Sequence, residues 1–463
     1  MSVGGTADIA ARLDRLPISR FHRRLLFVVG LAFFFDISDI FTFSYAAPAL
    51  IHTWHLEVSQ IALATSLGFL GMFIGAVGGG IISDRLGRKR SLIVMVSAFS
   101  FFSLLNGLAP NLPILLLARF LTGVGISSAT VVVMTIVSEF FPPTVRGRYQ
   151  SWAMVIALSG IPICGLIARL VVPTGPNGWR LIFIWGAVGI VSLLFIRKMP
   201  ESPRWYVAQG RFRDADATMQ QIETEVTAEM GPLPMPQPQV GLVEPVAHLS
   251  WTAIFSPMYI GRTMTLWSIW ILQTLGFYGF QAWVPTLLVK SGITVTTSLT
   301  YITLINIGAV PGALLAVYLS ERIERKYLIS ILALLIAGCG MLYGTTMSPP
   351  LIVTFGFAVA MLIQTFASIC YAYTPEQYPT EVRNAGAGFA YGAGRLANVA
   401  NAFIISAIYS TFGYIWVFGY IAAAWLCCAI VAAVFGARTR ARPLEVLSPV
   451  TLGYEGAARD RPA

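Results

Sequence analysis

The feature that most constrains this fold is a series of twelve apolar runs, each near or above the roughly 20 residues that cross a bilayer. Hydrophobic residues make up 56% of the chain and charged residues 11%, against about 25% charged in a soluble domain. Because lipid offers no partner to an unpaired backbone amide, such runs must be helical. We therefore predict an all-α membrane protein, with helices near residues 25–50, 59–82, 91–108, 112–138, 149–172, 180–196, 259–288, 299–319, 328–346, 351–373, 384–410 and 413–435.

The chain also repeats itself at an offset of 237 residues. Residues 83–90, Ser-Asp-Arg-Leu-Gly-Arg-Lys-Arg, return in degraded form as residues 320–327, Ser-Glu-Arg-Ile-Glu-Arg-Lys-Tyr. The same offset relates Glu139-Phe-Phe-Pro to Glu376-Gln-Tyr-Pro. Duplication of a membrane unit is typical of secondary transporters, which hold their substrate between the two halves. We therefore predict two pseudo-symmetric six-helix bundles.

The positive charges indicate the orientation in the membrane. Of the 31 Lys and Arg, 26 lie on one side: in the N-terminal tail, in the loops after the even-numbered helices or the first turn that follows such a loop, and in the C-terminal tail. Both termini are then expected in the cytoplasm. These loops account for the net charge of +10, so nucleic-acid binding is not expected. The first apolar run is too long for a signal-peptide core and should remain as a helix.

One long hydrophilic stretch separates the two halves. A helix is expected at residues 213–229, and the prolines of residues 232–238 favour an extended segment. The predicted units are a cytoplasmic N-terminal tail, an N-terminal bundle, a cytoplasmic linker, a C-terminal bundle and a cytoplasmic C-terminal tail, at residues 1–24, 25–196, 197–258, 259–435 and 436–463.

Chemistry other than transport has little support in the sequence. All five cysteines lie in apolar runs, without disulfide or metal spacing. There is no Gly-x-x-x-x-Gly-Lys loop for ATP and no convincing nucleophile with a base. We therefore expect no enzyme activity, no metal and no cofactor.

Several motifs together resemble a known transporter family. They are Asp-Arg-Leu-Gly-Arg-Lys at residues 84–89 with its echo in the second half, the Arg119…Gly123…Gly125 pattern, and Pro-Glu-Ser-Pro-Arg at residues 200–204. Over nearly its whole length the chain resembles the major facilitator superfamily. Within it, the motifs are similar to the branch of sugar porters, organic-ion transporters and aromatic-acid/proton symporters.

Two details place the resemblance closest to the aromatic-acid/proton symporters. Residues 36–39, Asp-Ile-Ser-Asp, match the Asp-x-x-Asp of those symporters, although Ile37 stands where they usually have glycine. Residues 278–288 resemble their Tyr-Gly…Trp-x-Pro-Thr-Leu-Leu pattern. A sugar porter would show Gln-Gln-x-Ser-Gly-x-Asn in this helix, and only Gln273 of that motif is present.

Charged residues deep in the first and fourth helices are candidates for proton coupling. Asp36 and Asp39 are three residues apart and share one helical face near mid-bilayer, so their repulsion favours the retention of a proton. The alternative is that one of them caps a kink or pairs permanently with an arginine. Arg119 in the fourth helix is associated in the family with proton coupling or with helix packing, and both readings stay open.

A second set of residues predicts the substrate site. Arg395 is equally deep, and it shares a face of the eleventh helix with Tyr391 and Asn398. A guanidinium can bind a carboxylate through two parallel hydrogen bonds, and an aromatic ring can stack on an aromatic substrate. The seventh helix adds a mixed polar and aromatic stripe of Trp270, Gln273, Phe277 and Gln281, of which we select the last three as substrate-binding residues.

The resemblance further implies a cytoplasmic gate. In the family fold, Asp84 approaches the N-terminal end of the eleventh helix, where the helix dipole favours an anion. Gly87 allows a tight turn, and Arg88 can pair with a nearby acid. The second copy has Glu324 in place of the glycine, so its role as a gate is doubtful. The matching inter-bundle ion pairs would use Glu139, Arg146, Glu376 and Arg383.

From these features we predict a proton-coupled secondary transporter, monomeric, in a bacterial inner membrane. Its expected partners are lipid, the proton and a small organic acid, most consistent with an aromatic monocarboxylate that is imported by alternating access. Alternatives within the fold are a sugar or polyol symporter and an exporter of apolar drugs. A membrane sensor that binds substrate without transporting it is the alternative outside transport.

Overall fold

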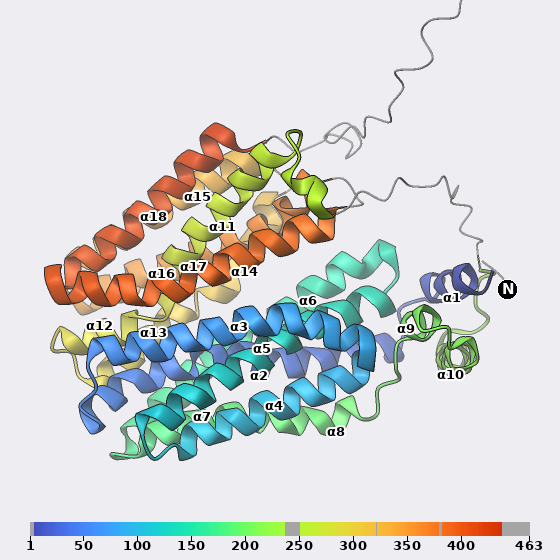
Figure 1. The fold of residues 1–463 in the computed structure, drawn as a ribbon, viewed down its shortest axis with the longest axis horizontal. Helices are drawn as coiled ribbons and strands as arrows, with labels where there is room; N and C mark the ends of the chain where they lie inside the picture. The colour runs from blue at the N-terminus through green and yellow to red at the C-terminus, as the bar shows by residue number, and fades with distance from the viewer. Residues whose placement is uncertain (1–3, 237–250, 321, 379–381, 438–463) are drawn as a thin grey trace, which may run out of the picture.

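The computed structural model describes residues 4–236, 251–320, 322–378 and 382–437. These residues form helices and no strand, arranged in two bundles that lie side by side (Figure 1). The N-terminal bundle consists of α2 (Arg20–Thr53), α3 (Val58–Leu86), α4 (Arg88–Leu108), α5 (Leu112–Phe140), α6 (Pro143–Val171), and α7 (Gly178–Ala187) followed by η2 (Val188–Ser192) and α8 (Leu193–Ile196). The C-terminal bundle consists of α11 (Ile260–Gln281) and α12 (Val284–Lys290), α13 (Val295–Asn306) and α14 (Ala309–Ser320), α15 (Arg325–Thr345), α16 (Pro349–Tyr373), α17 (Arg383–Phe412) and α18 (Tyr414–Phe435).

Ten helices within the described residues are long and apolar enough to cross a membrane, judged by length and composition alone. The two remaining spans of the expected twelve are α11 and α17. They carry Gln273 and Gln281, and Arg395 and Asn398, respectively, and polar residues lower their hydropathy. The two helices whose hydropathy is too low to be recognised as membrane spans are thus the ones predicted to line the substrate site.

Three expected helices are interrupted. The seventh breaks at Ala282 and Trp283. Pro285 lies in the first turn of α12, and in a continuous helix its ring would clash with the backbone carbonyl of Gln281. The eighth breaks near Gly308, where a Cβ would lie 2.7 Å from the backbone oxygen of Phe357. The sixth passes through the 3-10 segment η2.

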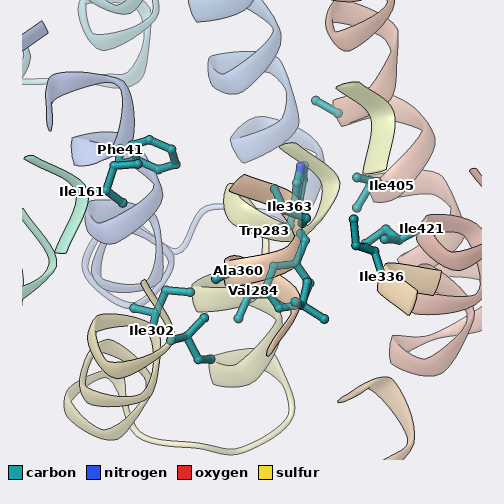
Figure 2. Close-up of a cluster of buried hydrophobic side chains, with 14 of the residues drawn as sticks. Phe41, Ile161, Trp283, Val284, Ile302, Ile336, Ala360, Ile363, Ile405 and Ile421 are labelled. Carbon is teal, nitrogen blue, oxygen red and sulfur yellow. The ribbon is translucent and has the colours of Figure 1, made fainter. Parts of the chain in front are cut away.

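We call the bundle ends next to α1 (Gly4–Asp14), α9 (Pro203–Ala208) and α10 (Phe212–Met230) the linker side, and the opposite ends the far side. The ribbons of the two bundles lie closest at the far side and diverge toward the linker side (Figure 1). There α12 packs against α2 and α13 against α6. Figure 2 shows Phe41 and Ile161 of the N-terminal half in the same buried apolar cluster as Ile302 and Val284 of the C-terminal half.

Hydrogen bonds reinforce this far-side contact. Asn306 Nδ2 donates to the hydroxyl of Tyr45 at 2.9 Å, and both residues are fully buried. Arg169 Nε donates to Thr300 Oγ1 at 2.6 Å. Because each bond joins one bundle to the other, the two halves are held together on the far side in this conformation.

On the linker side, α1 and α10 pack on the N-terminal bundle. The helix expected at residues 213–229 is confirmed as α10. Arg12 forms a two-pronged pair with Glu223, through Nε to Oε1 at 3.1 Å and Nη2 to Oε2 at 2.6 Å. Arg15 binds the same carboxylate at 2.5 Å. Leu13 of α1 and Ile222 of α10 belong to the apolar core of the bundle, so α1 is docked by both charge and burial.

This docking should depend on pH through Glu223. Burial alone would raise the pKa of Glu223, but hydrogen bonds from Arg12 and Arg15 outweigh it and lower that pKa. A carboxylate whose pKa is lower in the folded than in the unfolded state stabilises the fold at pH values above its unfolded pKa, which is about 4.3 for Glu. This contribution is lost as pH falls through the folded pKa. Hydrogen exchange of the α1 amides, corrected for intrinsic rates, should therefore keep its protection from pH 7 to 5 and lose it below about 4.3.

A Glu223→Gln variant should show the loss already at pH 7. Neutralising this partly buried carboxylate weakens its bonds from Arg12 and Arg15 and costs on the order of 1 kcal/mol, or about fivefold in protection. Glu225→Gln is the matched control, because Glu225 pairs with Arg24 of α2 and not with α1. Unchanged α1 protection in Glu223→Gln, or loss in the wild type between pH 7 and 5, would contradict this assignment.

Candidate functional site

Two carboxylates on one face of α2 form the centre of the candidate site. Asp36 and Asp39 are both buried. Asp36 accepts a hydrogen bond from Thr130 of α5. Asp39 accepts one from Ser103 of α4 at 2.6 Å. Each acid is therefore positioned by a hydroxyl from a different neighbouring helix.

Each acid also has an oxygen without a partner. Oδ1 of Asp36 and Oδ2 of Asp39 are buried and accept no hydrogen bond from the described residues. A buried anionic oxygen without a donor is costly, whereas a proton on that oxygen removes the charge. The pair is thus suited to taking up and releasing a proton. The alternative of a permanent arginine pair is not realised here, because neither acid forms an ion pair with the described residues.

Arg119 lies in α5, close to this acid pair. The residue is buried, and its guanidinium lies 5.0 Å from the centroid of the Phe43 ring. It attracts Asp39 electrostatically without touching it. Its Nε and Nη1 have no hydrogen-bond partner in the described part of the chain. A small cavity beside Arg119 is bounded by both halves, with Phe69 on one side and Tyr278 on the other, and has room for about one water molecule.

Arg395 reaches from the C-terminal bundle into the N-terminal bundle. Its Nη1 donates to Ser127 Oγ of α5 at 2.7 Å. It also attracts Asp36 electrostatically. One turn further along α17, the backbone oxygen of Val399 accepts from Ser66 of α3 at 2.7 Å. The predicted anion-binding residue thus lies at the crossing of the two bundles, and among the described residues Ser127 is its one hydrogen-bond partner.

Three aromatic rings gather next to Arg395. Tyr391 lies one turn before it on α17, with its ring centroid 4.5 Å from Trp270 of α11 and 5.1 Å from Tyr371 of α16. Trp270 and Tyr371 are 4.9 Å apart. We call Trp270, Tyr371 and Tyr391 the aromatic cluster. The sequence predicted Tyr391 here, but it did not select Trp270 or Tyr371, because aromatic residues are common in apolar helices.

The other predicted substrate residues are brought less closely together. Asn398 accepts from Asn401 at 2.8 Å, while its own Nδ2 is buried without a partner among the described residues. Gln281 likewise has a buried oxygen without a donor in the described structure. Gln273 donates to the adjacent Thr274 at 2.8 Å, and Phe277 packs edge-on against Tyr278.

Sequence analysis also missed Tyr278, although it belongs to the Tyr-Gly motif of α11. Its ring centroid lies 4.6 Å from that of Phe69 on α3. It therefore joins the two bundles at the depth of Arg395. The motif itself was the available signal.

The linker-side motif has a clear structural basis at Gly87. This residue has φ +96°, a conformation that favours glycine, and a Cβ there would collide with the carboxylate of Glu201 and lie 3.3 Å from the ring of Trp205. Glu201 in turn accepts from the backbone N–H of Arg88 at 2.7 Å and of Lys89 at 3.0 Å. Glu201 thus caps the N-terminus of α4. It belongs to the Pro-Glu-Ser-Pro-Arg motif, but no role for it was predicted from the sequence.

In this conformation the acids of the predicted gate pair within their own bundles. Arg88 binds Asp84 at 2.9 Å and Glu139 at 2.8 Å. In the second copy Arg325 pairs with Glu376. Glu324 stands where Gly87 would be and has φ −57°, so the left-handed turn is not repeated.

The remaining two gate residues are less informative. Arg146 donates to the backbone oxygen of Phe141 at 3.3 Å. The side chain of Arg383 lies outside the described residues. The inter-bundle pairing of this gate therefore stays a prediction.

Residues 33–450 match the family model described as "Sugar (and other) transporter". The chain belongs to this transporter family. The family is part of the major facilitator superfamily, so the resemblance seen in the motifs is confirmed. The protein is a multi-pass integral membrane transporter and not an enzyme.

Similar proteins from bacteria cover nearly the whole chain. YyaJ of Bacillus subtilis, named as a metabolite transport protein, is 44% identical, over 95% of this chain and 97% of its own length. The niacin transporter NiaP of Acinetobacter baylyi is 31% identical, over 95% and 99%. The 4-hydroxybenzoate transporter PcaK of Pseudomonas putida is 27% identical, over 87% and 89%.

A solved structure of the xylose transporter XylE from E. coli, in a partially occluded inward open conformation, shares the fold. It matches with a TM-score of 0.75, covering 92% of this chain and 100% of that one, at 18% identity. At this identity the likeness concerns the fold alone. It agrees with the predicted arrangement of twelve helices in two bundles.

Proposed function

We propose that this transporter imports a small aromatic monocarboxylate together with protons, by alternating access. The observation that carries the proposal is the position of Arg395, which lies where the two bundles cross and beside the aromatic cluster. Arginine can grip a carboxylate through two parallel hydrogen bonds, and the rings offer stacking surface for an aromatic body. Niacin and 4-hydroxybenzoate, named for two of the relatives, both have this chemistry.

Proton coupling follows from the electrostatic link between Arg395 and Asp36. Arg395 and Asp36 carry opposite charges and attract each other across the crossing of the two bundles. A substrate carboxylate bound to Arg395 would neutralise its charge, and protonation of Asp36 would then become easier. By linkage, a proton on Asp36 removes its attraction for Arg395, which is then free to bind the substrate carboxylate. The proton and the substrate therefore each promote binding of the other. Asp39, with Arg119 nearby, supplies a second protonatable group on the same face.

The orientation completes the proposed cycle. The excess of Lys and Arg on the linker side supports a cytoplasmic location for that side, with both termini, in a bacterial inner membrane. The far-side bonds of Tyr45 and Arg169 then close the outer entrance in the present conformation. In the opposite state, Asp84 and the acids and arginines of the predicted gate would close the cytoplasmic side. Because both substrate and proton sites lie within one chain, a monomer suffices.

A ligand screen followed by uptake tests the proposal. Purified protein should be stabilised against heat by aromatic monocarboxylates, and not by aliphatic acids, sugars or organic cations. The stabilising acid should accumulate in proteoliposomes when a proton gradient, inside alkaline, is imposed. Stabilisation by sugars alone would instead support a sugar symporter. Binding of neutral apolar compounds would support an exporter, and binding without any uptake would support a sensor.

A further inference from the structure

A groove on the membrane-facing surface of the N-terminal bundle plays no part in the proposed transport site. It lies on the linker side between α2 and the chain that leaves α8, and has a volume of about 400 Å³. Leu25, Val28 and Phe27 of α2 and Phe195 of α8 form its apolar walls. The rings of Phe27 and Phe195 meet edge to face with centroids 5.5 Å apart, and Phe27 is 53% exposed.

Two cations line the same groove, Arg24 and Lys198. Arg24 lies one turn inside the start of α2, and Lys198 follows the end of α8. Both are therefore at the level where a spanning helix passes from hydrocarbon to headgroups. Among the described residues, none that line the groove is acidic. Apolar walls below two cations at this depth match a lipid with an anionic headgroup.

The charges nearby are only partly compensated. Arg24 pairs with Glu225 of α10 at 2.9 Å through one nitrogen. The ammonium of Lys198 is exposed and has no hydrogen bond or ion pair with the described residues. Lys198 is thus the cation most available to a ligand, and Arg24 has further donors to offer.

We propose that this groove binds one anionic phospholipid, with its phosphate held by Lys198 and Arg24 and an acyl chain lying against Phe27 and Phe195. Basic pockets between helices at the membrane surface bind anionic headgroups in this way. A zwitterionic lipid fits less well, because its ammonium would face two cations, and the carboxylate of Glu225 already pairs with Arg24.

The test uses full-length protein in detergent, titrated with phosphatidylglycerol or with phosphatidylcholine of the same acyl chains. The readout is the lipid concentration that gives half of the maximal rise in melting temperature. Wild type should respond to phosphatidylglycerol at a concentration at least about fivefold lower than to phosphatidylcholine. Lys198→Gln should remove that difference. Arg197→Gln is the matched control, because Arg197 is an exposed neighbour that does not line the groove.

A variant that should increase the affinity for the anionic lipid provides a second test. Glu225→Gln removes the carboxylate that competes for Arg24, so phosphatidylglycerol should act at a lower concentration than in wild type. Soluble glycerophosphoglycerol, which has the phosphodiester of the headgroup without acyl chains, should stabilise at most weakly. Equal losses in Lys198→Gln and Arg197→Gln, equal responses to both lipids, or full stabilisation by glycerophosphoglycerol would each overturn the proposed site.

Discussion

An Asp36→Asn variant should lose proton-driven accumulation of substrate while it keeps part of its exchange activity. Asparagine has nearly the shape of aspartate, and its side-chain oxygen can still accept the hydrogen bond from Thr130. It cannot release or bind a proton in the working pH range, so the variant loses the coupling group and not its position. The accumulation ratio in proteoliposomes with an imposed proton gradient should fall to about one, the value at equilibrium.

Counterflow exchange is the control for this experiment. Exchange of labelled for unlabelled substrate does not require the empty carrier to return, so it tests binding and movement without net proton transfer. Asp39→Asn, which can keep the bond from Ser103, should be measured in parallel. Undiminished gradient-driven accumulation in both variants would show that neither acid carries the proton.

Much of the fold could be predicted, because the membrane leaves few choices. An apolar run of bilayer length must be helical, and the offset between the two copies indicated the bundles. The breaks were not predicted. Pro285 is visible in the sequence, but the break near Gly308 depends on the approach of Phe357 from another helix, which only the packed structure shows.

The candidate site divides in the same way. Charged residues stand out in an apolar helix, so Asp36, Asp39, Arg119 and Arg395 could be selected from sequence. Their partners could not, because hydroxyls such as Ser127 occur in many helices and only tertiary packing decides which one meets a charge. Glu201 could be predicted only in part. Its motif drew attention to the segment, but its contact with the start of α4 can be seen only in the folded structure.

An Arg395→Lys variant should bind the aromatic acid at least about tenfold more weakly than wild type, corresponding to roughly 1.4 kcal/mol. Lysine keeps the charge and can still donate to Ser127, which now receives a bond from Arg395 Nη1. It lacks the planar fork that holds both oxygens of a carboxylate at once. Affinity is best measured as the acid concentration that produces half of the maximal thermal stabilisation.

Two comparisons distinguish a loss of carboxylate recognition from a general disturbance of the protein structure. The amide analogue of the substrate cannot use the fork fully, so it should bind wild type weakly and lose little further in Arg395→Lys. Ser127→Ala removes the hydroxyl that accepts from Arg395 but leaves the guanidinium free for a ligand, so affinity for the substrate acid should fall less than in Arg395→Lys. If Arg395→Lys binds acid and amide as wild type does, the carboxylate is bound elsewhere, and the link between substrate and Asp36 would need another cation.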